Sequence, residues 1–147
     1  MNSVCHPPIV LDGLAPDQLI LARFEAFRNA DFALVYDTFH RESTLRRQFV
    51  NRDTYVGYAR THLQSSYRML GCQILGHDCK EDEARVISLM TVEVDGKSQR
   101  YAELAWLRRE KGRWCYHRGQ RWDESLPDHL EMIDFAAFDR LEPKLIL

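Results

Sequence analysis

Two side chains capable of acid–base chemistry stand among apolar neighbours in the sequence, His40 and Glu103. A histidine titrates near neutral pH, which makes it a frequent acid, base or ligand contact. A glutamate inside an apolar strand is costly to bury as an unpaired charge, and burial moves its pKa toward the range of a general base. Both residues are therefore candidate catalytic groups.

Each of these two residues also has a structural interpretation, which we favour. His40 is predicted to end a helix, where an imidazole can donate to the last carbonyl groups. Thr38 and Ser43 are then cap and turn residues, or hydrogen-bond neighbours of His40 if it faces a cavity. Glu103 is predicted to form a buried ion pair with Arg23, because a guanidinium matches a carboxylate with two parallel hydrogen bonds.

Aromatic residues are spread along the chain and could line a ligand cavity. Ligand sites are concave and mostly aromatic or apolar, with a few polar groups that set orientation. The same residues could equally fill a core. Our candidates for ligand binding are Arg23, Tyr36, His40, Tyr58, Tyr101, Glu103, Trp114 and Tyr116, with Tyr55 as a further wall residue.

The sequence carries no metal or cofactor signature that we recognise. None of the four cysteines belongs to a Cys-x-x-Cys pair, and a closed zinc site needs four ligands. The adjacent Cys5 and His6 offer only two. Serine-hydrolase, metalloprotease and phosphate-loop motifs do not occur. We predict no metal and no cofactor, and the enzyme question stays open.

Composition narrows the class of protein further. The 147 residues suit one domain, and 45% hydrophobic with 29% charged residues is an ordinary globular balance. A formal net charge of -2 gives no reason to expect nucleic acid or an anionic membrane as partner. No apolar run approaches the roughly 20 residues that span a bilayer, and the N-terminus does not read as a signal peptide. We expect a cytoplasmic protein.

The elements that must position these residues follow from periodicity. After an extended lead-in over residues 1–15, apolar residues at helical spacing predict one helix from Pro16 and a second after Asp31. A third helix fits Asn51 to Gln64. We assign residues 16–125 to one compact unit and residues 126–147 to a helical tail, with Leu130, Ile133, Phe138 and Leu141 as its buried positions.

The second half of that unit predicts an antiparallel meander. Asp95-Gly96 and Lys111-Gly112 are turn signals between three long strands, and MLGCQILGH provides a strand before them. In the middle strand Leu104 and Trp106 point to one face while Ala105 and Leu107 point to the other, so both faces need cover. The helices cover one face. The tail covers the other, or a second subunit does so in a homodimer.

Three stretches of the sequence together resemble a known family. They are RFEAF (Arg23–Phe27), TFHRES (Thr38–Ser43) and ELAWLRREKGRWCYHRG (Glu103–Gly119). In this order and spacing they resemble the middle domain of YchJ-like, SEC-C-motif-associated bacterial proteins, over roughly residues 18 to 120. That domain is part of the nuclear-transport-factor-2-like (NTF2-like), or cystatin-like, superfamily. The resemblance implies an α+β fold: a cone of N-terminal helices packed on a curved antiparallel sheet.

The sequence departs from that family pattern at several points. The zinc-binding SEC-C knuckles do not occur in it, a hairpin tyrosine is replaced by Cys115, and we place no counterpart for the tail after Trp122. The resemblance implies no catalytic residues. We therefore predict a non-catalytic domain that binds a small molecule or peptide and self-associates through its sheet. The alternatives are a small enzyme that uses Glu103 or His40 for proton transfer or hydrolysis, and a protein–protein interaction module.

Overall fold

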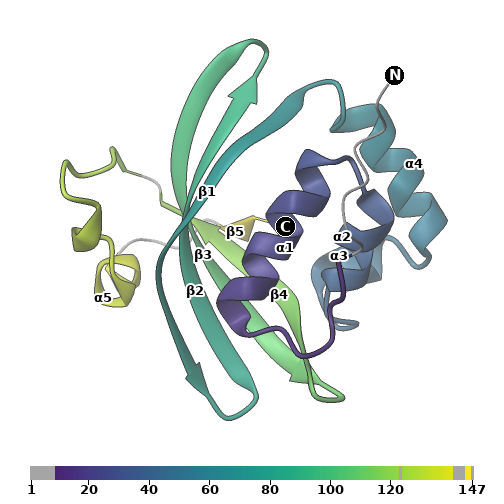
Figure 1. The fold of residues 1–147 in the computed structure, drawn as a ribbon, viewed down its shortest axis with the longest axis horizontal. Helices are drawn as coiled ribbons and strands as arrows, with labels where there is room; N and C mark the ends of the chain where they lie inside the picture. The colour runs from purple at the N-terminus through teal and green to yellow at the C-terminus, as the bar shows by residue number, and fades with distance from the viewer. Residues whose placement is uncertain (1–8, 123, 141–144, 147) are drawn as a thin grey trace.

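The computed structural model describes residues 9–122, 124–140 and 145–146 (Figure 1). Cys5, His6 and Leu141, which appear in the predictions above, lie outside the described residues. The helices are α1 (Pro16–Arg28), α2 (Phe32–Thr38), α3 (Thr44–Gln48), α4 (Arg52–His62), the 3₁₀ turn η1 (Leu130–Met132) and α5 (Phe135–Asp139). The strands are β1 (Tyr67–Lys80), β2 (Glu83–Val94), β3 (Lys97–Glu110), β4 (Arg113–Arg121) and β5 (Leu145–Ile146).

The N-terminal helices begin where their capping residues stand. Proline at the first position of α1 loses no hydrogen bond there. The Asp31 side chain accepts from the Leu34 N–H at the start of α2, and the Asn51 side chain accepts from the Thr54 N–H at the start of α4. These three helices were predicted. The short α3 was not, although its cap, Ser43, is of the expected residue type.

The strands form one antiparallel sheet in the order β1-β2-β3-β4-β5. At both predicted hairpins the two turn residues have positive φ, with 51° and 81° at Asp95 and Gly96 and 51° and 74° at Lys111 and Gly112. This is the turn geometry that matches strand twist, so the predicted hairpins are confirmed. Between β3 and β4, Leu107 pairs with Tyr116 and Trp106 pairs with Arg118. His117 is therefore an extra residue on β4 and forms a β-bulge.

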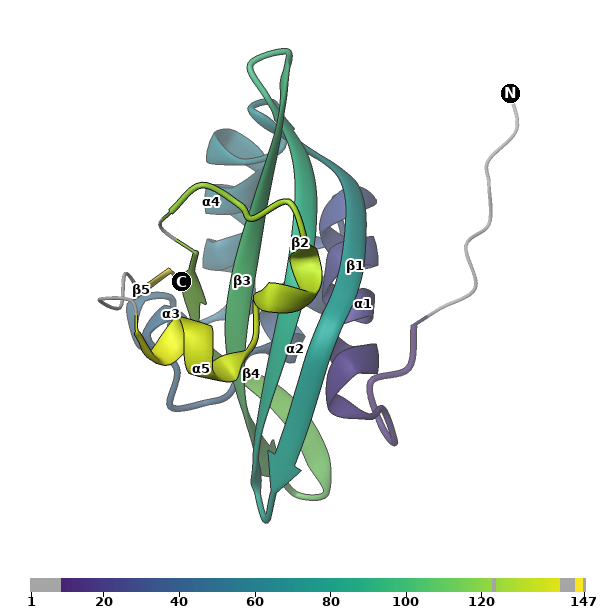
Figure 2. The same ribbon diagram turned by 90° about the vertical axis from the view of Figure 1, so that its left-hand side faces the viewer.

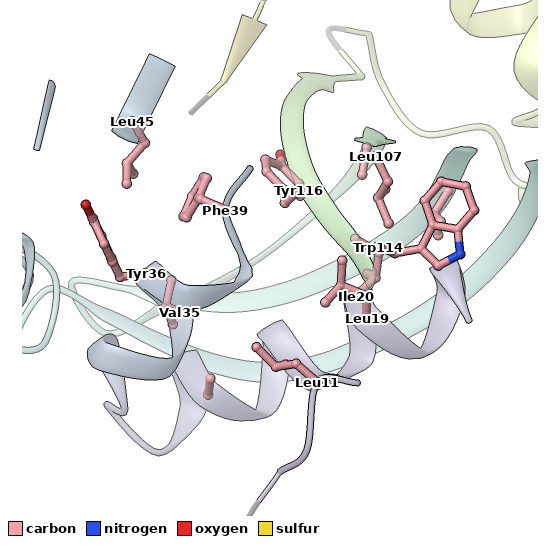
Figure 3. Close-up of a cluster of buried hydrophobic side chains, with 14 of the residues drawn as sticks. Leu11, Leu19, Ile20, Val35, Tyr36, Phe39, Leu45, Leu107, Trp114 and Tyr116 are labelled. Carbon is pink, nitrogen blue, oxygen red and sulfur yellow. The ribbon is translucent and has the colours of Figure 1, made fainter. Parts of the chain in front are cut away.

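The sheet curves around α1, α2 and α4, while the C-terminal segment crosses its opposite face (Figure 2). On the concave face, helical side chains pack against Ala84, Val86, Ala105 and Leu107 of the sheet. Figure 3 shows part of this cluster, with Leu19 and Ile20 of α1 near Leu107. On the convex face a second apolar cluster joins the sheet to the tail, and its buried members are Ile87, Ala102, Leu104, Ile133 and Phe138.

Both sheet faces are therefore apolar and covered, as the alternation in β3 predicts. The tail covers the convex face. A sheet-face dimer was expected as the alternative cover if the tail lay elsewhere, and that condition is not met. The oligomeric state itself stays a prediction. Within the described residues, no helix has the length and apolar character needed to cross a membrane.

The tail differs from the single helix that was predicted. Ile133 lies outside helical geometry, with φ −86° and ψ 88°, and separates η1 from α5. The Asp134 side chain then accepts from the Ala137 N–H at 2.8 Å and starts a new helix. Ile133 and Phe138 are buried as predicted, while Leu130 is half-buried.

Candidate functional site

A cavity of about 450 Å³ lies between the helices and the concave face of the sheet. Aromatic side chains from both layers form much of its wall, among them Phe24, Phe27, Phe49, Tyr55, Tyr58 and Tyr67. Its polar lining residues are Arg23, Gln48, Ser88, Gln99, Glu103 and Arg121. An apolar wall with a few polar groups is the usual composition of a small-molecule site.

Three neighbouring strands bring the central polar groups of this cavity together. Ser88 on β2 and Glu103 on β3 are directly paired across the strands, so their side chains project from the same face of the sheet. Tyr116 on β4 donates its hydroxyl hydrogen bond to the Glu103 carboxylate at 3.2 Å. Alternation along each strand thus sets these three groups on the cavity side.

Arg23 reaches this group from α1. Its guanidinium carbon lies 3.8 Å from the centroid of the Tyr116 ring and 4.5 Å from that of Phe39, and Nη1 donates to Thr38 Oγ1 at 2.6 Å. The predicted two-bond pair between Arg23 and Glu103 is not formed. The ring of Tyr116 provides the contact for the guanidinium, and its hydroxyl provides the contact for the carboxylate.

The electrostatics of the cluster follow from burial and from these two opposite charges. Burial raises the pKa of the Glu103 carboxyl above its ordinary value, while the Arg23 charge and the Tyr116 hydrogen bond oppose that rise. Burial likewise lowers the pKa of Arg23. Burial, with the neighbouring Glu103 charge, raises the pKa of the Tyr116 hydroxyl well above its ordinary value. Tyr116 therefore remains a hydrogen-bond donor at neutral pH.

Ser88 was not predicted as a site residue. Its side chain is only 1% exposed, it borders the cavity, and its Oγ has no hydrogen-bond partner among the described residues. A buried hydroxyl without a partner is uncommon and costs free energy. The sequence did hold a signal, because Ser88 interrupts the apolar inner face of β2 between Val86 and Met90.

His40 does not line the cavity and does not cap α2. The helix ends two residues earlier, at Thr38, and the His40 backbone N–H donates to the Tyr116 carbonyl at 2.8 Å. Its Nδ1 accepts from the Glu42 N–H at 3.0 Å, and its Nε2 lies 3.4 Å from Glu110 Oε2. Burial lowers the pKa of this imidazole, against the opposing effect of Glu110. The structure therefore contradicts the predicted placements of His40, at the end of the helix and in the cavity wall.

Thr38 and Ser43 likewise make no side-chain hydrogen bond to His40. The Thr38 hydroxyl donates to the Val35 carbonyl at 2.6 Å while it accepts from Arg23. The Ser43 hydroxyl accepts from the Arg46 N–H at the start of α3. Both therefore have the cap and turn roles of the structural interpretation.

The remaining predicted ligand contacts divide into two groups. Tyr36 and Trp114 do not border the cavity: the Tyr36 hydroxyl donates to the Phe49 carbonyl at 2.8 Å, and Trp114 is buried in the inner core. The predicted residues that do border it are Arg23, Tyr58, Tyr101, Glu103 and Tyr116, together with Tyr55. Across the part of the chain that the structure describes, no group of three or more His, Cys, Asp or Glu side chains could hold a metal ion.

A family model for the middle NTF2-like domain of YchJ matches residues 15–119, from the start of α1 into β4. The chain belongs to this YchJ-like domain family. The three stretches that suggested the resemblance meet beside the cavity: Arg23, Glu103 and Tyr116 border it, and Thr38 accepts a hydrogen bond from Arg23. Residues from all three stretches are therefore linked by direct contacts.

Solved structures share the NTF2-like fold of this YchJ-like domain. A SEC-C motif containing protein from Rhodopseudomonas palustris has 22% identity and a TM-score of 0.59, covering 74% of this chain and 80% of that one. A SEC-C motif containing protein from Psychrobacter arcticus has 13% identity and a TM-score of 0.53, covering 79% and 74%. An NTF2 design has 10% identity and a TM-score of 0.55, covering 72% and 95%. No curated protein matches the chain.

Proposed function

We propose that this domain binds a small uncharged molecule with an apolar or aromatic body and a hydrogen-bonding edge. The observation that carries the proposal is the cavity of about 450 Å³ with an aromatic wall. In that wall Ser88, whose hydroxyl is buried and has no hydrogen-bond partner among the described residues, lies beside Glu103. Its volume falls in the range of roughly 300–1,000 Å³ that small-molecule sites occupy. That size suits a compact molecule better than a length of peptide.

The charge of the cavity supports an uncharged ligand. An ionised Glu103 and Arg23 carry opposite charges within one cluster, so in that state the inner end of the cavity has no net charge. Arg121, the third charged lining residue, is exposed to solvent. A buried ligand charge without a counter-charge is strongly unfavourable. A charged ligand would leave one charge of the cluster unmatched.

The polar groups support a ligand edge that both donates and accepts. A serine hydroxyl can serve as donor and acceptor, and an ionised carboxylate has lone pairs beyond the one that Tyr116 occupies. Arg23 makes a single side-chain hydrogen bond among the described residues, to Thr38, and it also borders the cavity. A carboxamide or a ring lactam would match this arrangement.

A cavity-filling variant tests the location of binding. Naphthalene-2-carboxamide serves as the probe, titrated by calorimetry. Val92→Phe adds a ring at a buried position of the cavity wall and should abolish binding, while Val10→Phe, at a position 65% exposed and away from the cavity, should not. Saturable binding that survives Val92→Phe in a folded protein would place the ligand elsewhere and overturn the proposal.

A second candidate function is proton transfer with Glu103 as the base. It is favoured by one observation, a carboxyl group that borders the cavity and whose pKa burial raises. Glu103→Gln would then remove turnover of a bound carbon acid while probe binding persists. An equal loss of turnover and of probe binding would show instead that Glu103 contributes to ligand binding. His40, the other catalytic candidate, offers no comparable support because it lies outside the cavity.

Self-association through the sheet is the remaining part of the predicted function. The tail residues Ile133 and Phe138 already occupy the apolar convex face, so a dimer there would require the tail to move. The same cover leaves little apolar surface for another protein partner on this face. Light scattering on the intact chain tests both the homodimer and the interaction-module alternative, and a monomer at high concentration would remove the support for the homodimer.

A further inference from the structure

A second cavity, of about 380 Å³, lies between the loop after α2 and the β3–β4 hairpin. Four basic side chains and two acidic ones border it: Arg41, Arg46, Lys111 and Arg113, with Asp12 and Glu110. We propose that this second cavity is a binding site for the phosphate group of a small soluble molecule.

The net positive charge of the second cavity favours an anion as its ligand. Its lining carries an excess of two positive charges, and gathering like charges in one hollow is unfavourable without a counter-ion. Glu110 is already engaged, since its two oxygens lie 3.4 Å from His40 Nε2 and 3.4 Å from Arg41 Nε. A phosphate monoester carries a charge of about −1.5 to −2 at pH 7, which matches the excess.

Two of the arginines are held in fixed orientations. The Arg46 guanidinium lies 4.2 Å from the centroid of the Tyr36 ring, and its Nε is a buried donor without a hydrogen-bond partner among the described residues. Arg113 is anchored by one bond, from Nη2 to the Asp37 carbonyl at 3.2 Å. A guanidinium that is oriented in advance loses less freedom when it binds the oxygens of a phosphate.

The second cavity is distinct from the cavity of about 450 Å³ between the helices and the sheet, which we call the cone cavity. Phe39 borders both and forms a wall between them, while on α3 Leu45 faces the cone cavity and Arg46 faces the second one. The phosphate proposal therefore does not depend on a ligand in the cone cavity, and a separate experiment tests it.

Calorimetric titration of inorganic phosphate into the intact chain tests the proposal. We expect saturable binding at millimolar phosphate and weaker binding of acetate, which carries one charge. Arg46→Gln should weaken phosphate binding about tenfold or more. Arg47→Gln, the same change at the next residue on α3, which is exposed and outside the cavity, should leave it unchanged. Equal weakening by the two variants would mean diffuse surface attraction and would overturn the site.

A further variant keeps the test valid if Arg46→Gln fails to fold. Lys111 is exposed in a turn with φ 51°, a conformation that asparagine tolerates, so Lys111→Asn removes one charge without strain. It should weaken phosphate binding severalfold. A lack of saturable phosphate binding would overturn the proposal. If the chain also co-sedimented with phosphatidic acid vesicles, that result would assign the arginines to a membrane surface instead.

Discussion

The hydroxyl of Tyr116 donates a hydrogen bond to the carboxylate of Glu103 across 3.2 Å. The ring of the same tyrosine lies 3.8 Å from the Arg23 guanidinium carbon. One aromatic side chain therefore contacts both a buried guanidinium group and a half-buried carboxyl group. This arrangement makes the inner end of the cone cavity polar but uncharged overall, which is the basis of the proposed ligand chemistry.

Replacing Glu103 with glutamine should not destabilise the fold at neutral pH. The amide keeps the shape of the side chain, can still accept from Tyr116 and is neutral like a protonated carboxyl. Because burial raises the pKa of Glu103 against the effect of the Arg23 charge, the neutral form suits the folded chain better than the ionised form. We expect the free energy of unfolding at pH 7, measured by chemical denaturation, to stay the same or rise by about 1 kcal/mol. The control is Glu93→Gln on β2, which removes an exposed ion pair with Arg68 and should cost less than about 1 kcal/mol. A fall of more than about 1 kcal/mol for Glu103→Gln would show that the Arg23 charge outweighs burial.

The Glu103 carboxyl should also make stability depend on pH. Its pKa in the folded chain is raised above the ordinary 4.5, so the folded state binds a proton that the unfolded state has released. The contribution of Glu103 to stability is therefore fully present below pH 4.5 and is lost as the pH rises through the folded pKa. A carboxyl carbon titration by NMR should give a pKa above 4.5. A value below 4.5 would show that Arg23 and Tyr116 outweigh burial.

Removing the Ser88 hydroxyl should move stability and binding in opposite directions. Ser88→Ala deletes a buried polar atom that has no partner among the described residues, so the free energy of unfolding should rise by about 1 kcal/mol. Affinity for naphthalene-2-carboxamide should fall. The control is Thr38→Ala, because the Thr38 hydroxyl accepts from Arg23 and its loss should destabilise the chain. A destabilised Ser88→Ala would mean that the hydroxyl is already satisfied.

Opening the convex face should change the oligomeric state. Phe138 is 2% exposed in the outer cluster, and Phe138→Ala should cost roughly 3–5 kcal/mol and increase association in light scattering. Met132→Ala, at a tail residue that is 63% exposed, should change neither property by much. An intact chain that is a dimer, and that Phe138→Ala converts to a monomer, would show instead that the tail forms the interface.

The features that were predictable from the sequence are those set by local chemistry. Asp95-Gly96 forms its hairpin because both residues adopt positive φ at little cost, and this preference is local to the dipeptide. Leu104 and Ala105 lie on opposite faces because side chains alternate along any strand. Asp31 and Asn51 cap their helices for an equally local reason.

The features that were not predictable depend on contacts between distant segments. A bridge between Phe39 and Tyr116 ends α2 early and carries His40 away from the cone cavity toward Glu110. Tyr36 and Tyr58 both lie in helices, yet only Tyr58 borders that cavity. The bulge at His117 shifts the register of β4 without a glycine or proline at that position.

The choice of ligand head group tests whether the cone cavity selects an uncharged hydrogen-bonding ligand. Three probes with the same naphthalene body are titrated into the intact chain: naphthalene-2-carboxamide, 2-naphthoate and 2-methylnaphthalene. We expect the carboxamide to bind about tenfold more tightly than either other probe, because only it is both uncharged and able to pair with Ser88 and Glu103. Tightest binding of the carboxylate, or equal binding of 2-methylnaphthalene, would contradict this expectation.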